Sequence, residues 1–463
     1  MSVESVLLYV LGVLVIVIGL AVSIGLHEVG HLLPAKLFGV RVTQYMIGFG
    51  PTIFSRKRGE TEYGLKAIPL GGFIAMSGMY PPKRPGGAPR EASTGFLQAL
   101  SGDEKQARQQ HPAGLSAMIQ EAREASAETI VQGEEHRTFY QLPVWKRIVI
   151  MVGGPAMNLV LGFVFYAIVM VGFGVAQPGL TVSSVNECVV ASDSAQTDCT
   201  DDDPIAPGAE AGVLPGDEIV AIDGEQAANW DQVSGVIRGA AGRTIALDVL
   251  RDGEPLTLQV TPLLTERAVV DDDDAVVTDA DGEVVTQEVG FVGITPQYEV
   301  VQQPITEVPA AVGENVERVV HLILNLPQRL VDVAQAAFGG GERDPDGPIS
   351  VVGVGRFAGE IAALDTIPVA DKVSAMLGIL ASLNVALFVF NLVPLMPLDG
   401  GHVAGAVWEG VRRFFAKLFG RPDPGPVDTA KVIPLTFVVV ILLGGMSALL
   451  IYADLVNPIS LFG

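Results

Sequence analysis

Four long stretches without a charged side chain constrain this chain more than any other feature. They cover residues 5–26, 148–175, 373–398 and 433–453. Each is long enough to cross a hydrocarbon core of about 30 Å as a helix that rises about 1.5 Å per residue. Hydrophobic residues make up 49 % of the 463 residues, which leans towards a membrane protein, and the four apolar stretches decide the class. The sequence predicts a polytopic α-helical membrane protein with four transmembrane helices, at 5–37, 148–175, 373–398 and 433–455.

The net charge of −23 is spread unevenly along the chain. Residues 36–147 carry 15 basic and 10 acidic side chains, whereas residues 176–373 carry 9 basic and 35 acidic side chains. Because basic loops stay in the cytosol, we expect a cytosolic insert at 80–147 and a cytosolic loop at 403–432. Both termini and the acidic segment are then outside. The acidity also excludes nucleic acid as a partner, since binding to phosphates needs basic side chains.

The motif HEVGH lies at the end of the first apolar stretch, where ionisable side chains are costly. On a helix, His27 and His31 lie on one face because they are four residues apart. Two imidazoles in this arrangement can bind one Zn²⁺, and Glu28 beside the first can act as a general base on water. The motif therefore predicts a zinc site, in preference to a helix whose polar face only contacts a partner.

The third zinc ligand is expected in NLVPLMPLDGGH, residues 391–402, at the end of the third span. A catalytic zinc usually takes three protein ligands. Pro394 and Pro397 interrupt a helix here, and irregular backbone at membrane depth needs a cover of protein or a watery cavity. Asp399 reaches the depth of HEVGH from the opposite chain direction, so it is the candidate third ligand. His402 competes with it, because imidazole also binds zinc.

Residues 40–78 alternate apolar and polar side chains in two runs around RKRGE, which predicts a β-hairpin. Glycine within a strand marks a bulge or a close backbone approach. The glycines of GFGP and PLGG are Gly48, Gly50, Gly71 and Gly72, and they are the candidates for such a bulge or close approach.

The acidic segment holds a separate α+β domain. Short β runs surround one helical stretch near 230–238. With an earlier strand included, we place this domain at 179–264. Residues 265–372 are expected to form an acidic loop and an amphipathic helix, because 308–338 has apolar residues at helical spacing and is broken or bent at Pro327.

Both cysteines of the chain, Cys188 and Cys199, fall in this external segment. An oxidising compartment permits a local disulfide between them. Two free thiols are the alternative.

These motifs, in this order, resemble the site-2 protease family. The resemblance rests on HEVGH in a first span, GFGP and PLGG in a hairpin, GGPAMN opening the second span, and N-x-x-P-x-x-P-L-D-G-G closing the third. The external domain, with GVLPGDEIVAIDG, resembles a PDZ domain. The match is closest to the bacterial branch, M50-type intramembrane zinc metalloproteases that cleave anti-sigma factors in regulated intramembrane proteolysis.

The resemblance implies a zinc site with three ligands and a catalytic base. These are His27, His31, Asp399 and Glu28. It also implies that Asn391 lies near the bound substrate backbone, where its amide holds the substrate or assists the oxyanion. The alternative for Asn391 is a hydrogen bond between packed helices. Asn158 in GGPAMN has a weaker claim and is expected to pack spans together.

The resemblance further implies where such a protein acts and on what. It places the chain in the bacterial cytoplasmic membrane, with the active site near the cytosolic side and the PDZ-like domain outside. Substrates are single-span membrane proteins such as anti-sigma factors, cut first on the outer side by a site-1-type protease. The hairpin at 40–78 resembles the family's membrane-re-entrant β-hairpin on the cytosolic side, which implies that it binds the unwound substrate by strand addition. Gly48, Gly50, Gly71 and Gly72 are then candidate substrate-binding residues. The PDZ-like domain either binds substrates or excludes uncut ones.

Two other classes of function compete with this one. A PDZ scaffold with a catalytically dead membrane part is disfavoured by the intact HEVGH and by Asp399. A transporter that moves metal or protons past intramembrane ionisable groups is disfavoured by the combination of a strand hairpin with a PDZ-like domain.

Overall fold

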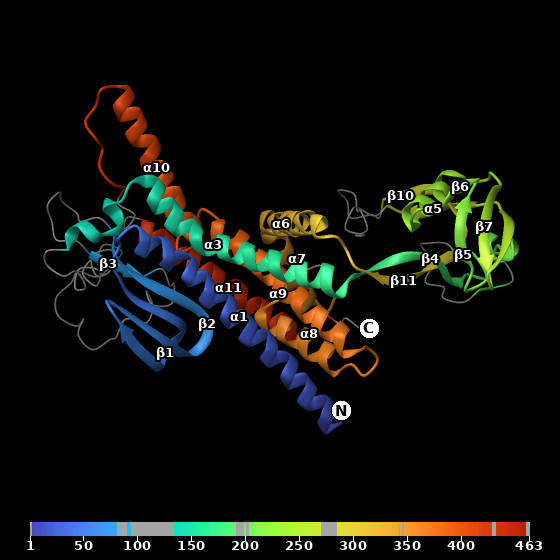
Figure 1. The fold of residues 1–463 in the computed structure, drawn as a ribbon, viewed down its shortest axis with the longest axis horizontal. Helices are drawn as coiled ribbons and strands as arrows, with labels where there is room; N and C mark the ends of the chain where they lie inside the picture. The colour runs from blue at the N-terminus through green and yellow to red at the C-terminus, as the bar shows by residue number, and fades with distance from the viewer. Residues whose placement is uncertain are drawn as a thin grey trace. The chain divides into compact units, whose positions relative to one another are not determined.

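Four long apolar helices form the framework of the protein in the computed structural model (Figure 1). They are α1 (Val3–Leu37), α3 (Val144–Ala167), α9 (Val369–Leu392) and α11 (Ile433–Val456). A π-helical turn at Ile168–Phe173 extends α3. Each of the four is long and apolar enough to cross a membrane. The predicted set of four long apolar helices is confirmed.

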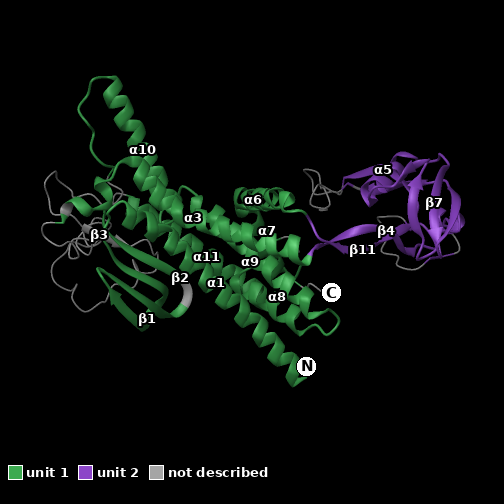
Figure 2. Ribbon diagram, in the orientation of Figure 1, with its two compact units in different colours: residues 1–173, 304–463 green, residues 174–303 purple. Residues whose placement is uncertain are grey.

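The structure describes residues 2–80, 90–93, 134–190, 199–200, 203–269, 285–341, 343–344, 347–427 and 432–459. Most of the cytosolic insert expected at 80–147 lies outside these described residues. The chain divides into two compact units, and Figure 2 colours them separately. The first comprises residues 1–173 and 304–463, and the second comprises residues 174–303.

Close helix contacts in the first unit depend on glycine. Helix α3 packs against both α1 and α9. A Cβ on Gly30 of α1 would lie 2.2 Å from the carbonyl oxygen of Gly153 in α3. A Cβ on Gly12 would lie 2.3 Å from the carbonyl oxygen of Ala358 in α8 (Val351–Ala363). Small residues let helix backbones approach closely in a membrane, and here they hold α1 at two points along its length.

The amphipathic segment after the second unit is broken into two helices just before Pro327. These are α6 (Val308–Leu324) and α7 (Leu326–Gly339), and they meet at Asn325. Proline is tolerated in the first turn of a helix, where its missing N–H costs nothing. Pro327 therefore belongs to the start of α7. Short 3-10 helices precede α3 and α6, at Glu135–Arg137, Phe139–Gln141 and Ile305–Glu307.

The stretch after α9 differs from expectation in two ways. Helix α9 ends at Leu392, before the predicted end of the third span at 398, because the residue before Pro394 is disfavoured in helical conformation. A new helix, α10 (Asp399–Leu418), then begins before the loop expected at 403–432 and continues into it. Asp399 lies in its first turn, where a carboxylate is favoured by the helix dipole.

The segment predicted to be a hairpin at 40–78 forms a sheet whose strands bend more strongly than those of a simple two-stranded hairpin. Its strands are β1 (Val42–Arg58) and β2 (Thr61–Tyr80), with the short β3 (Arg90–Ser93) beside β2. Near its start, β1 lies opposite one stretch of β2, with Ile47 opposite Gly72. The same part of β1 also lies opposite a second stretch, with Ile47 opposite Leu65. The first half of β1 is therefore enclosed between two parts of β2.

The second unit is built around an antiparallel sheet and a helix. The sheet order is β11 (Ile294–Val301), β4 (Val175–Val185), β5 (Glu218–Ile222), β7 (Ile245–Arg251) and β8 (Glu254–Val260), with β6 (Glu225–Gln226) paired to β5. Helices α4 (Pro207–Glu210) and α5 (Trp230–Gly239) accompany it. A separate pair joins β9 (Leu263–Ala268) to β10 (Thr286–Phe291).

Buried aliphatic side chains from the sheet and from α5 form the core of the second unit, including Val182, Ile219, Val233, Leu247 and Val249. Strand β11 lies in the segment expected to be an acidic loop, and it pairs along β4. The unit therefore extends beyond the domain expected at 179–264, because β4 continues beyond β5 and takes β11 as its partner.

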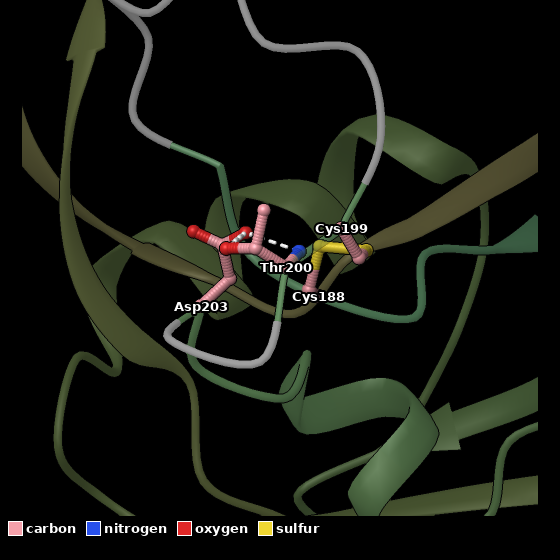
Figure 3. Close-up of a disulfide and its surroundings, with 4 residues drawn as sticks. All are labelled: Cys188, Cys199, Thr200 and Asp203. Atoms are coloured by element: carbon pink, nitrogen blue, oxygen red, sulfur yellow. Dashed lines mark hydrogen bonds between the residues drawn. A yellow bond between two sulfur atoms is a disulfide. The ribbon is translucent and has the colours of Figure 1, made fainter.

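A disulfide joins Cys188 and Cys199 in the second unit (Figure 3). Next to it, the backbone N–H and the hydroxyl of Thr200 both donate to Asp203 Oδ2, at 2.7 and 2.8 Å. The choice that the sequence left open between a bridge and two free thiols is settled in favour of the bridge.

Candidate active site

Two helices bring three possible metal ligands together. His27 and His31 lie one turn apart on α1, and Asp399 begins α10. The two Nε2 atoms are 3.1 Å apart, and Asp399 Oδ2 lies 3.3 Å from that of His27 and 3.2 Å from that of His31. All three side chains are buried. Two imidazole nitrogens and one carboxylate oxygen are a ligand set that zinc accepts.

Helix α3 orients both imidazoles. The Nδ1 atom of His31 lies 2.7 Å from the carbonyl oxygen of Ile150, so it carries the proton and leaves Nε2 as the ligand atom. The amide nitrogen of Asn158 lies 3.1 Å from His27 Nδ1, and the side chain is fully buried. Metal binding through His27 Nε2 requires the proton on Nδ1, and the amide oxygen of Asn158 accepts a hydrogen bond from that N–H when the amide is turned over. Outer partners of this kind fix the tautomer and direction of metal-binding histidines. Asn158 thus contacts a candidate ligand in addition to packing between helices.

The space in front of the ligand nitrogens exists because residue 154 is glycine. A Cβ on Gly154 would lie 2.2 Å from His31 Nε2 and 2.7 Å from His27 Nε2. Any larger side chain would fill the volume into which both nitrogens point. The donor set and this open volume together fit a zinc ion.

Glu28 lies between the histidines and the sheet. Its side chain is buried. A Cβ on Gly72 of β2 would lie 2.9 Å from Glu28 Cγ and 3.2 Å from Ile24 Cγ2. The strand therefore passes directly against this turn of α1, and only glycine at position 72 permits the contact. A carboxylate next to the metal ligands can serve as a proton acceptor.

The other three candidate glycines have local backbone roles. Gly48 and Gly50 have positive φ angles of 91° and 81°, and Gly71 has a φ of 142°. A Cβ on Gly48 would lie 2.7 Å from the carbonyl oxygen of Ile68. A Cβ on Gly71 would overlap the ring of Phe49 at 1.9 Å. Gly48 and Gly71 thus permit the tight bends of β1 and β2, and the structure brings only Gly72 into contact with Glu28.

Two further candidates lie near the cluster without joining it. The Asn391 side chain donates to the carbonyl oxygen of Leu387 in its own helix, at 2.9 Å. His402 lies one turn after Asp399 and lines a cavity of about 20 Å³ with Arg147 and Glu409. Among the described residues, Asp399 rather than His402 completes the cluster.

Several polar contacts around the site escape sequence reasoning, although the apolar stretches that contain Ser23 and Asn384 were recognised. Ser23 and Asn384 are both buried, and the Asn384 amide donates to Ser23 Oγ at 3.0 Å between α1 and α9. Arg147 and Glu409 form a buried ion pair between α3 and α10. Polar groups inside apolar helices are the signal that points to such contacts, because they are costly without partners.

Comparison with known proteins agrees with this geometry. The sequence profile of peptidase family M50 matches residues 15–420. The chain belongs to peptidase family M50. It is 31 % identical to the zinc metalloprotease Rip1 of Mycolicibacterium smegmatis and 32 % identical to Rip1 of Mycobacterium tuberculosis, over 98 % of this chain and 100 % of each relative. It is 26 % identical to the metalloprotease MmpA of Caulobacter vibrioides, over 85 % of both chains.

This M50 member is a multi-pass membrane protein and a zinc metalloprotease of the intramembrane protease family. The expected membership of the site-2 protease family, the enzyme class and the zinc cofactor are confirmed. A catalytically dead scaffold and a transporter are therefore set aside.

Proposed function

We propose that this M50 metalloprotease cleaves the transmembrane segments of single-span membrane proteins of the anti-sigma-factor kind, after a first cut outside the membrane. The observation that carries the proposal is the position of the buried ligand cluster, which lies on a span-length apolar helix. A site at that depth is accessible to a substrate that is itself in the membrane. Rip1 is named a zinc metalloprotease, which agrees with this chemistry.

In this proposal, His27, His31 and Asp399 hold the zinc. When bound, zinc polarises the scissile carbonyl and makes water a stronger acid. Glu28 takes a proton from the attacking water and later gives it to the nitrogen of the leaving amine. Asn158 and the Ile150 carbonyl keep the imidazoles in the direction that the reaction requires.

The substrate lies as a strand along the edge of β2. A transmembrane helix hides its amides in internal hydrogen bonds, so it must unwind before cleavage, and a strand edge replaces those bonds. The first half of β1 has β2 on both sides, which leaves β2 to supply the edge near the site. Gly72 of β2 contacts Glu28, and the described residues of β3 pair with β2 from Ala75 onwards. A strand added beside Gly72 would pass next to the catalytic base.

Asn391 binds the substrate backbone in the same proposal. Its amide is half-buried near the end of α9, and its present hydrogen bond is to its own helix. Rotation of the side chain would release the amide for a substrate carbonyl. We place the termini and the second unit outside the cytosol, following the basic residues at the other ends of the spans.

The second unit acts as a PDZ-like domain in this proposal. It combines antiparallel strands with α5 in one α+β fold, and its core contains Ile219 and Ile222 of the GDEIVAIDG sequence. Its role is to select substrates that have already been shortened by a site-1-type protease. Its location between α3 and α6 in the chain gives it two covalent connections to the membrane unit.

The decisive experiment replaces the proposed base. Purified Glu28→Gln protein should retain zinc and bind a single-span substrate in vesicles, but should not cut it. Glu4→Gln, at the other end of the same helix, is the matched control and should cut normally. Persistent cleavage by Glu28→Gln would show that another group is the base, and cleavage only of water-soluble peptides would contradict the membrane substrate.

A further inference from the structure

Helix α10 exposes an apolar face that no described part of the protein covers. The residues of this face recur at helical spacing: Val407, Val411, Phe414, Phe415 and Leu418. Phe414 is 64 % exposed and Leu418 is 63 % exposed. Five large apolar side chains on one open stripe form a patch of the kind that marks a contact with a membrane or a partner.

The opposite face of α10 is held firmly against the protein. Glu409 is 0 % exposed, and its carboxylate accepts hydrogen bonds from two nitrogens of Arg147 in α3. The backbone N–H of Val427 also donates to it, at 3.0 Å, and Arg413 lies 3.0 Å from it. Rotating α10 to bury its apolar face would pull this charged group out of its partners. The apolar face is therefore directed away from the helix bundle.

The ion pair between Arg147 and Glu409 also fixes the position of α10 along the length of the spans. Arg147 belongs to the first turn of α3, so Glu409 is level with the beginning of that span. Trp145 and Trp408 are both more than half exposed at this level, and the Lys146 ammonium lies over the rings of Trp145 and Phe38. Tryptophan and basic residues gather at the boundary between lipid and water. The second half of α10 extends away from the other helices from this level (Figure 1).

The charges of α10 complement an anionic surface. Its two acidic residues, Asp399 and Glu409, are both buried. Basic residues border the apolar face or follow it, namely Arg412, Lys417 and Arg421. An amphipathic helix with bulky apolar residues on one side and basic residues beside them favours the interface of a bilayer that contains anionic lipids.

We propose that α10 is an interfacial helix that binds the anionic lipid surface, with Phe414, Phe415 and Leu418 in the boundary between headgroups and acyl chains. Lys417 and Arg421 contact the headgroup phosphates. Because Asp399 is the first residue of α10, the lipid contact also steadies the helix that supplies a metal ligand. This inference is independent of the proposed substrate.

A single tryptophan on the apolar face tests the proposal. The chain has three tryptophans. Replacing all of them together, by Trp145→Phe, Trp230→Phe and Trp408→Phe, leaves Phe415→Trp as the single fluorescent tryptophan. The full-length protein is placed in nanodiscs with one copy each, using lipids brominated in the upper acyl chain. We expect loss of fluorescence from residue 415 with brominated lipid and little loss with aqueous iodide. Leu442→Trp, on the exposed face of α11, is the positive control for lipid contact.

Two outcomes would overturn the lipid assignment. Quenching by iodide and not by bromine would place the face in water. Protection from both quenchers would show that protein covers the apolar face. Protection in discs with one copy would assign the cover to another segment of this chain. Protection that appears only in discs with two copies would assign it to a second copy. Retained zinc content in Phe415→Trp confirms that the variant is folded.

The headgroup contact has its own test. Raising the fraction of phosphatidylglycerol over phosphatidylcholine should increase bromine quenching of residue 415, and Lys417→Gln with Arg421→Gln should remove that dependence. Both side chains are exposed and lie outside the metal cluster. Quenching that is the same in both lipids would overturn the assignment of anionic headgroups as the ligand.

Discussion

Gly154 is the residue on which the open volume of the metal site depends most directly. Gly154→Ala would place a Cβ 2.2 Å from His31 Nε2, so the imidazole would have to move and the zinc would be lost. We expect purified Gly154→Ala to contain little zinc when metal content is measured by atomic emission. Gly444→Ala is the matched control, because a Cβ at Gly444 in α11 would meet nothing within 4 Å. An equal zinc content in both variants would contradict this reading of the site.

The Asn158 side chain should also affect how tightly the site holds zinc. Its amide faces His27 Nδ1, and removal of such a partner typically weakens metal affinity or activity by about 10–100-fold. Asn158→Leu should therefore release zinc to a competing chelator at a lower chelator concentration than the unmodified protein. Asn315→Leu removes a buried amide bonded to Ser382 instead and should leave zinc affinity unchanged. A shift of similar size in Asn315→Leu would show that the effect is general destabilisation.

At the scale of elements, the ion pair of Arg147 with Glu409 joins α10 to α3. Breaking a buried pair by removing one charge typically costs about 3–5 kcal/mol. Glu409→Gln should therefore lower the melting temperature and also speed zinc release, because α10 carries Asp399 and α3 orients both histidines.

The pair of Arg343 with Asp454 provides the control for that experiment. It is also buried, and it involves α11 rather than a helix that carries or orients a metal ligand. Asp454→Asn should lower the melting temperature without changing the rate of zinc release. If Glu409→Gln and Asp454→Asn release zinc at the same rate, the ion pair between Arg147 and Glu409 does not hold the metal ligands in place beyond its effect on stability.

A carboxylate in the second unit gives a pH dependence that can be measured. Asp217 is buried, Arg251 donates to both of its oxygens at 2.8 Å, and the Leu214 N–H donates at 2.9 Å. The hydrogen bonds from Arg251 lower the pKa of Asp217 below its ordinary value. A lowered pKa in the folded state means that the stabilisation is complete above the unfolded pKa of about 3.9 and is lost as the pH falls.

We therefore expect the second unit to unfold at lower denaturant concentration as the pH falls below about 4. Trp230 reports on this unit when Trp145 and Trp408 are replaced by Phe, since it begins α5. Asp217→Asn should lower the midpoint at neutral pH and should flatten its dependence on pH. A pH dependence as steep in Asp217→Asn as in the unmodified protein would assign the titration to other groups.

Elements with a strong local signal were predictable from the sequence, and elements set by distant contacts were not. Length and lack of charge identified the spans, and the spacing of HEVGH placed two ligands on one helical face. Asp399 required the argument that two spans reach the same depth. The double pairing of β1 depends on bends at Gly48 and Gly71, which local alternation does not reveal. Helix α10 was missed because its apolar face points outwards, next to two prolines that suggested a loop.

At the scale of the whole molecule, zinc links the metal site to stability. A ligand that binds only the folded state raises the free energy of unfolding, by about 2.7 kcal/mol when its concentration is one hundred times its dissociation constant. Since His27 and His31 lie on α1 and Asp399 on α10, chelation should lower the melting temperature of the protein, and added zinc should restore it. His27→Ala should melt at a temperature that does not respond to zinc. A melting temperature unaffected by chelation of the unmodified protein would contradict a resident metal in this position.

The crossing of α1 and α3 at Gly30 and Gly153 has a consequence for how a substrate enters. A backbone contact this close leaves no room for a side chain, and the same two helices share the hydrogen bonds that aim both imidazoles. Separating α1 from α3 would dismantle the reaction centre. A substrate helix therefore cannot enter between α1 and α3 at this crossing, and its entrance has to lie along another side of the bundle.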